Sequence, residues 1–185
     1  MSISSLRIVA IGGSVRPDNF TMQALRVVTQ HLETLPGVEV STIDPATVDW
    51  PLPGREGDDP GIAKAQSLVE SADGVILATP EYHGSVSSVL KLVIENLGFP
   101  SRLAGKPIAL VGVAAGAIGA IQSLGQLRQI GSHVGGLVLP GAVSIAGVHQ
   151  VFEDGKITDS ATEGRLTKLG DGLISYLRET TCPSI

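Results

Sequence analysis

The residues best suited to chemistry lie in one short stretch, residues 79–85, with the sequence Thr-Pro-Glu-Tyr-His-Gly-Ser. The stretch follows an apolar run, residues 74–78, that predicts a buried strand, and a helical pattern begins directly after it. A loop between a strand and a helix is where open α/β sheets place ligands. Pro80 stiffens the entry, and Ser85 is the expected N-cap of the helix. With a flat aromatic and a glycine between them, the stretch suits a flat ring with polar edges, such as a flavin, and hence a redox enzyme or an electron carrier.

The roles expected inside this stretch differ from residue to residue. The backbone N–H groups of residues 82–84 are candidates to donate hydrogen bonds to the acceptor edge of a flavin pyrimidine. Tyr82 is expected to pack on something flat rather than to transfer protons. For Glu81 a direct chemical role stands beside the alternative of a solvated loop carboxylate. For His83 the alternative is an ordinary surface histidine.

A second candidate loop, residues 13–21, follows the first predicted strand. Ser14, Asn19 and Thr21 offer hydroxyl or amide donors, and Arg16 can pair with a phosphate in bidentate fashion. The helix behind the loop adds free backbone N–H groups and the positive end of its dipole. Together these features predict a phosphate-binding cup, although the G-x-x-x-x-G-K-[ST] pattern of a P-loop is absent. The alternative is a capped helix with a solvent-facing arginine.

Apolar strand-like runs alternate with amphipathic helical segments along the chain, which predicts an α/β fold with a parallel sheet. The expected strands cover residues 6–11, 38–43, 74–78, 108–114 and an interrupted stretch at 134–145. The expected helices cover residues 20–35, 61–71, 86–97, 120–130 and 160–178, and a hairpin-like turn is expected at 152–156. Five strands suit a flavodoxin-like three-layer sandwich with the strand order 2-1-3-4-5.

In that order strands one, three and four are neighbours, so the loops that follow them should meet at one edge of the sheet. The third of these loops, residues 112–119, is rich in glycine and alanine. Such a loop lets the backbone approach a ligand closely, and helix–strand packing is the alternative reason for its composition. The chain shows no repeat and no second domain, so residues 1–185 are expected to form one domain.

Composition excludes several classes of function. A net charge of −5 argues against nucleic acid as the main partner. The longest apolar stretch, residues 108–121, is too short to span a membrane. The single cysteine, Cys182, excludes an intramolecular disulfide, and one cysteine with four scattered histidines predicts no metal site. Residues 1–5 lack the features of a signal peptide, so a cytoplasmic protein is expected.

These motifs resemble those of the NADPH-dependent FMN reductases of flavodoxin-like fold, a family that includes quinone, azo-dye and chromate reductases. The resemblance spans roughly the whole chain and rests on Gly13-Ser14-x-Arg16, Asn19-Phe20-Thr21, residues 79–85, and the segments 103–107, 127–128 and 139–141. It implies FMN as the cofactor, NADPH or NADH as the co-substrate and a small oxidised molecule as the electron acceptor. It also implies a homodimer or homotetramer with the helix after residues 79–85 at the interface.

By this resemblance, the FMN phosphate would be bound by Ser14, Arg16, Asn19, Phe20 and Thr21. The isoalloxazine ring would be bordered by Pro80, Glu81, Tyr82, His83, Gly84 and Ser85, with Ala115 and Gly116 on its other side. The flavin N5 would carry the hydride chemistry, so no side chain is expected to be a catalyst. The chain departs from the family at Asn19, where serine is more common, at His83, which is often asparagine, and after Glu95, where many relatives carry tryptophan.

The resulting hypothesis is a two-step exchange, in which NAD(P)H reduces the flavin and an oxidised acceptor then takes the electrons. The main alternative is a flavodoxin-type electron carrier without direct NAD(P)H turnover. Such carriers sandwich the flavin between aromatics and present an acidic face, so an aromatic content of 3% and a net charge of −5 favour the enzyme. A dinucleotide-binding Rossmann enzyme is disfavoured because G-x-G-x-x-G is absent after the first strand, and a hydrolase because G-x-S-x-G is absent.

Overall fold

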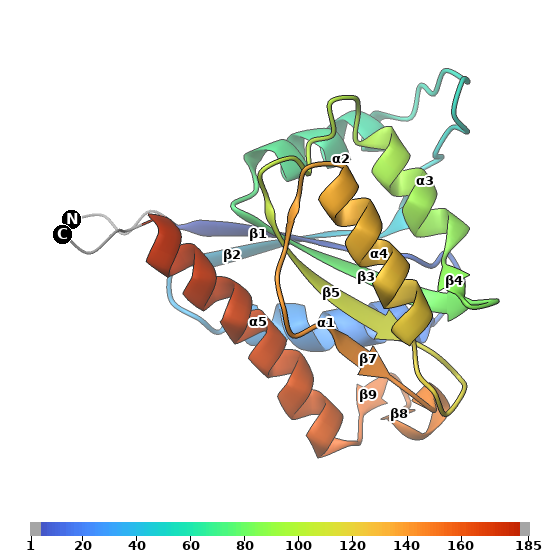
Figure 1. Cartoon of the computed structure of the whole chain (residues 1–185), viewed down its shortest axis with the longest axis vertical. Helices are drawn as coiled ribbons and strands as arrows, with labels where there is room; N and C mark the ends of the chain where they lie inside the picture. Colours follow the sequence, from blue (N-terminus) through green and yellow to red (C-terminus); the bar gives the residue numbers. More distant parts are fainter. Residues whose placement is uncertain (1–4, 182–185) are drawn as a thin grey trace.

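The structure, a computed structural model, describes residues 5–181. Strands and helices alternate along the chain (Figure 1) in the order β1 (Leu6–Ile11), α1 (Phe20–Glu33), β2 (Val38–Ile43), α2 (Pro60–Ser71), β3 (Gly74–Tyr82), β4 (Ser85–Val86), α3 (Ser88–Asn96), β5 (Pro107–Val113), α4 (Ile121–His133), β6 (Leu137–Val138), β7 (Val143–Ile145), β8 (Phe152–Glu153), β9 (Lys156–Ile157) and α5 (Ser160–Thr181). Short 3₁₀ helices, η1 (Pro45–Thr47) and η2 (Val148–Gln150), follow β2 and β7. Cys182 and residues 1–4, which entered the predictions about disulfides and signal peptides, lie outside the described residues.

The main sheet in the described residues is parallel along the path β2-β1-β3-β5-β6. This is the expected order 2-1-3-4-5, with β5 in fourth place, so the flavodoxin-like fold class is confirmed. The fifth strand is split, because β6 pairs with the start of β5 and β7 pairs with its end. The break contains Pro140, which has no N–H to donate, and Gly141, whose φ of 84° suits glycine.

The sheet is covered on both faces, as a parallel sheet requires. Alternate residues of β1 show how the two cores divide. Ile8 and Ala10 belong to the core that contains residues of α1 and α5. Val9 and Ile11 belong to the core that contains residues of α2, α3 and α4. The molecule is therefore the three-layer sandwich that the sequence predicted (Figure 1).

The main difference from the prediction concerns residues 79–85, which were expected to form a loop. β3 continues through Tyr82: residues 79–80 pair with β5, and residues 81–82 pair with β4. Only His83 and Gly84 remain as a turn between β3 and β4. The expected loop is therefore a β-hairpin that extends the central strand, because its residues find hydrogen-bonding neighbours in β5 and β4.

The hairpin also moves the start of α3, and the prediction that Ser85 caps this helix is wrong. The N-cap is Ser87, whose Oγ accepts a hydrogen bond from the Leu90 N–H (3.1 Å). The same Oγ donates to the carbonyl oxygen of Gly13 (2.6 Å), in the loop after β1. Ser85 instead donates to Oε1 of Gln126 in α4 (2.7 Å). Ser87 thus joins the loop after β1 to the start of α3.

The C-terminal part of the chain follows the predictions closely. The hairpin-like turn expected at residues 152–156 is the two-stranded sheet β8-β9. α5 begins at Ser160, and Asp159 before it accepts a hydrogen bond from the Thr162 N–H (2.9 Å). Hydrogen bonds from the Thr162 side chain and N–H hold the pKa of the Asp159 carboxyl below its usual range.

Replacing Ser87 by alanine should destabilise the protein clearly. The change removes an N-cap, worth about 0.5–2 kcal/mol, and leaves the buried Gly13 carbonyl without its donor, which costs about 1–3 kcal/mol. We expect a loss of at least about 2 kcal/mol in the free energy of unfolding, measured by urea denaturation. Ser88→Ala is the matched control, because Ser88 is exposed and should change stability by less than about 0.5 kcal/mol. Equal losses in the two variants would contradict the assigned cap.

Candidate functional site

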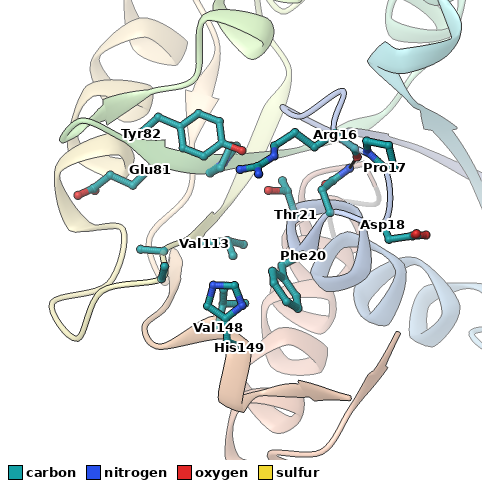
Figure 2. Close-up of a pocket in the computed structure, with 14 residues that line it drawn as sticks. Arg16, Pro17, Asp18, Phe20, Thr21, Glu81, Tyr82, Val113, Val148 and His149 are labelled. Carbon is teal, nitrogen blue, oxygen red and sulfur yellow. Dashed lines mark hydrogen bonds between the residues drawn. The ribbon is translucent and has the colours of Figure 1, made fainter. Parts of the chain in front are cut away.

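A cavity of about 280 Å³ lies at the carboxyl ends of β1, β3 and β5. Four segments line it, and Figure 2 shows Arg16 and Tyr82 on one side of the space with Phe20 and His149 on the other. The lining residues are Arg16, Pro17, Asp18, Asn19, Phe20, Thr21, Pro80, Glu81, Tyr82, Val113, Ala114, Ala115, Val148 and His149. The segments that follow β1, β3 and β5 therefore converge as expected, and η2 closes the cavity as a fourth wall.

The N-terminus of α1 forms one end of the cavity. Asn19 is its N-cap: Oδ1 accepts from the Met22 N–H (2.9 Å), and the side-chain amide donates to the Arg16 carbonyl (2.7 Å). Asn19 thus shapes the predicted phosphate-binding cup, and its side-chain amide forms hydrogen bonds within the loop and the first turn of α1. The N–H groups of Phe20 and Thr21 have no hydrogen-bond partner among the described residues, since the first turn of a helix leaves them free. They can bind an anion at the positive end of the helix.

The loop before this helix is held in place by buried contacts. Ser14 is buried, does not line the cavity, and accepts a hydrogen bond at Oγ from the Arg16 N–H (3.3 Å). Gly13 has no room for a side chain, because a Cβ would stand 2.6 Å from the carbonyl oxygen of Ala78 in β3. The side chain of Arg16 is exposed and reaches the cavity wall. Arg16 is therefore available to an anionic ligand, whereas Ser14 sets the shape of the turn.

The β3–β4 hairpin forms the opposite end, and its turn has a specific geometry. His83 and Gly84 both have positive φ, 51° and 71°, which is the pattern of a type I′ two-residue turn. Histidine belongs with asparagine and aspartate among the residues enriched in this left-handed conformation. Neither turn residue nor Ser85 lines the cavity. The departure from the family at His83 thus has a backbone explanation.

The hairpin is attached to α4 by side chains. Glu81 Oε2 accepts a hydrogen bond from the Ser123 N–H (2.9 Å), in the first turn of a helix whose N-cap, Ala120, has no capping side chain. A carboxylate in this position stabilises the positive end of the helix. Gln126 bonds to the hairpin through Ser85 and, at 3.4 Å, through the Gly84 carbonyl. Glu81 is therefore a capping group for α4 and at the same time part of the cavity wall.

The loop after β5 leaves space beside the cavity. Ala114 and Ala115 line it with small side chains. Gly116 does not line it, but nothing stands within 4 Å of the position that a Cβ would take there. Gly119 has a φ of 78°, and a Cβ would lie 2.5 Å from Ser144 Oγ. Local packing explains the glycine at 119, while the glycine at 116 keeps the loop surface open.

Two lining residues, Val148 and His149, were missed by the sequence predictions. They belong to η2, which follows β7 at the same edge of the sheet. The His149 ring stands perpendicular to that of Phe20, with the ring centroids 4.9 Å apart. Only their position in the chain could have indicated these two residues. They follow the fifth predicted strand, and the carboxyl ends of all parallel strands lie at the same edge of the sheet. The described residues contain no group of His, Cys, Asp and Glu that could hold a metal ion, and no helix among them could cross a membrane.

Comparisons with known proteins identify the family. Residues 6–150 match the model of the NADPH-dependent FMN reductase family. The chain belongs to this family. It is therefore an oxidoreductase that works with FMN and a reduced nicotinamide dinucleotide. The cytoplasmic location expected from the sequence stays a prediction.

Two sequence relatives support the family assignment, and two solved structures share the fold. An NADPH azoreductase of Bacillus sp. (strain OY1-2) is 33% identical over 159 residues, which cover 84% of each chain. A quinone reductase of Escherichia coli is 30% identical over 184 residues, covering 90% of this chain and 94% of the relative. The FerB flavoenzyme NAD(P)H:(acceptor) oxidoreductase of Paracoccus denitrificans superposes with a TM-score of 0.78 at 23% identity, over 94% of this chain and 98% of FerB. A flavodoxin from the domain Archaea has a TM-score of 0.67 at 14% identity, over 94% of this chain and 99% of that one, so carriers and enzymes share the fold.

The residues of the cavity fit an FMN molecule. Two free N–H groups at the N-terminus of α1 and the Arg16 guanidinium suit a phosphate. One part of the cavity wall has no bulky side chains and consists of Pro80, Ala114 and Ala115. Tyr82 adds a flat aromatic surface against which a ring can pack. Small-molecule sites of this kind combine mostly apolar walls with a few placed polar groups.

The turn geometry makes a prediction about His83. Asparagine or glycine at this position should keep stability within about 0.5 kcal/mol of the native protein, whereas valine should cost about 1–2 kcal/mol because a β-branched residue resists positive φ. Thermal unfolding of the three variants measures this. The native affinity for FMN should survive His83→Asn, since His83 does not line the cavity. Loss of FMN binding in a stable His83→Asn protein would show that the imidazole itself contacts the cofactor.

Proposed function

We propose that this protein transfers electrons from NAD(P)H, through FMN held in the cavity, to a small conjugated acceptor such as a quinone or an azo compound. When bound, FMN supplies the hydride chemistry. One observation carries the proposal. The N-terminus of α1, with its two free N–H groups, and Arg16 open onto a cavity that is partly lined by small side chains. This cavity lies at the carboxyl edge of the sheet between β1 and β3, where the strand order reverses, the place known as the switch point. The acceptor class is proposed from the azoreductase and quinone reductase relatives.

The side chains divide into binding and supporting groups in this proposal. Arg16, with the N–H groups of Phe20 and Thr21, would bind the phosphate. Pro80, Glu81, Tyr82 and Ala115 would border the ring. Ser14, Asn19, His83, Gly84 and Ser85 would act indirectly, by fixing the cup and the hairpin, and Gly116 would keep space open next to the ring.

No side chain needs to be an acid or base for the hydride step. The carboxylate of Glu81 points away from the centre of the cavity (Figure 2) and accepts a hydrogen bond from the Ser123 N–H in α4. The contribution of the chain is orientation and the exclusion of water from one side of the ring. A flavodoxin-type electron carrier remains the alternative function, and an aromatic content of 3% together with the named reductase relatives favours the enzyme.

The proposed function predicts NADPH oxidation that depends on FMN and an acceptor. The purified protein should quench FMN fluorescence on binding and should oxidise NADPH when FMN and benzoquinone are both present. Arg16→Ala should weaken FMN binding by roughly 10- to 100-fold, since a charge-assisted hydrogen bond contributes about 1.5–3 kcal/mol. Riboflavin, which lacks the phosphate, should bind both proteins alike. Arg26→Ala is the matched control, because Arg26 is exposed on α1 outside the cavity wall. FMN binding without NADPH turnover would instead support an electron carrier.

We also propose that the protein forms a homo-oligomer through the surface around α3 and α4. Phe99 follows α3 and is fully exposed, an unusual state for so large an apolar ring. Next to it lies an apolar cavity of about 890 Å³, lined by Phe99, by Ile94 of α3, and by Ile130 and Val134 near the end of α4. A two-fold axis would bring the same surface together from both copies, so an exposed ring and a cavity on one face can complement each other.

Phe99→Ser should shift the assembled protein toward monomer, because the change removes the most exposed apolar ring of this surface. Light scattering after size exclusion over a range of concentrations measures the shift. Phe99→Leu should largely retain assembly, and the circular dichroism of both variants should match that of the native protein. A monomeric native protein, or a serine variant that assembles as tightly, would contradict the interface.

A further inference from the structure

His149 lies in the cavity wall, and the proposed function gives it no role. It is exposed, sits in η2, and stands edge-on to Phe20 at 4.9 Å. Phe20 is the first residue of α1 and supplies one of the two free N–H groups. Figure 2 shows His149 and Phe20 side by side, facing the same space as Arg16. The imidazole therefore lies next to Phe20, whose N–H group is one of those suited to an anion, and across the cavity from Arg16.

The charges that line the cavity do not balance a phosphate. Of the described lining residues, Arg16 is the one permanent cation, while Asp18 and Glu81 are carboxylates. A phosphate monoester adds about −1.5 to −2 charges at pH 7. The positive end of α1 compensates only part of this charge, equivalent to roughly half an elementary charge. A neutral His149 would leave the occupied cavity with an excess of negative charge.

We propose that His149 takes up a proton when the FMN phosphate enters the cavity and acts as a second cation, across the cavity from Arg16. This inference rests on the proposed function. The ordinary pKa of histidine is about 6.5, and a nearby anion favours the charged form. A cavity of about 280 Å³ is small enough for a charge on its wall to act on a ligand without full screening at physiological salt. Histidine is the side chain whose charge responds to such a change near neutral pH.

The other titratable groups near His149 do not account for the same effect. Asp18 and Glu81 are carboxylates and Tyr82 is a phenol. Side chains of these two types do not ordinarily change charge near neutral pH. Glu153 in β8, which packs against η2, is exposed and likewise a carboxylate. The FMN phosphate titrates near pH 6, and binding to cations would make it release protons. Proton uptake at pH 7.5 therefore points to the imidazole.

The experiment is isothermal titration calorimetry of the apoprotein with FMN and with riboflavin, in two buffers of different ionisation enthalpy at pH 7.5. The native protein should take up roughly half a proton on binding FMN and close to none on binding riboflavin. His149→Gln should abolish the uptake and weaken FMN binding several-fold at pH 6.5 but little at pH 8.5. His133→Gln, which removes an exposed histidine of α4 outside the cavity, should behave like the native protein.

The outcomes separate this inference from the function on which it rests. If FMN binds tightly to the native protein without proton uptake, or with equal uptake in His149→Gln, the role of His149 is wrong and the proposed function stands. If the native protein binds no FMN, both are overturned. Riboflavin binding by His149→Gln shows whether the cavity of the variant is intact. Weaker FMN binding caused by a damaged fold can therefore be distinguished from weaker binding caused by the lost imidazole charge.

Discussion

The structure depends on one close approach, where the loop after β1 lies against β3. Gly13 is needed there because a Cβ would stand 2.6 Å from the carbonyl oxygen of Ala78. Its own carbonyl accepts from Ser87 Oγ at 2.6 Å, and the Ser87 N–H donates to Thr79 Oγ1 at 3.1 Å. These contacts are buried, so breaking one would leave a polar group without water. They fix the end of the cavity next to α1 relative to the hairpin and to α3.

Several side chains that suggested chemistry serve to position the backbone instead. Asn19 caps α1, Glu81 caps α4, and Ser85 is held by Gln126. Each of these hydrogen bonds joins two elements or closes a turn at the rim of the cavity. This use of polar residues is consistent with a cofactor enzyme, in which the cofactor supplies the reactivity and the protein supplies a rigid, correctly shaped site.

The fold alone does not decide between an enzyme and an electron carrier, since both kinds of protein share this parallel sheet and its switch point. The distinction lies in the walls of the cavity. Small residues such as Ala114 and Ala115 line it, and Tyr82 is the one tyrosine or tryptophan among the described lining residues. These walls differ from the pair of flanking aromatic rings expected of a flavodoxin-type carrier. Membership of the NADPH-dependent FMN reductase family agrees with this arrangement.

The sequence by itself determined the order of the elements, the parallel sheet, the convergence of three loops at one edge and the family. These features follow from local patterns: apolar runs, helical spacing and short motifs. Tertiary structure decided the rest. Residues 79–82 are strand because 79–80 pair with β5, more than thirty positions away in the chain, and that hairpin moved the helix cap from Ser85 to Ser87. His149 lies in the cavity wall because η2 follows β7 at this edge of the sheet and packs against Phe20. Contacts between residues far apart in the chain leave no local signal, so only the folded arrangement reveals them.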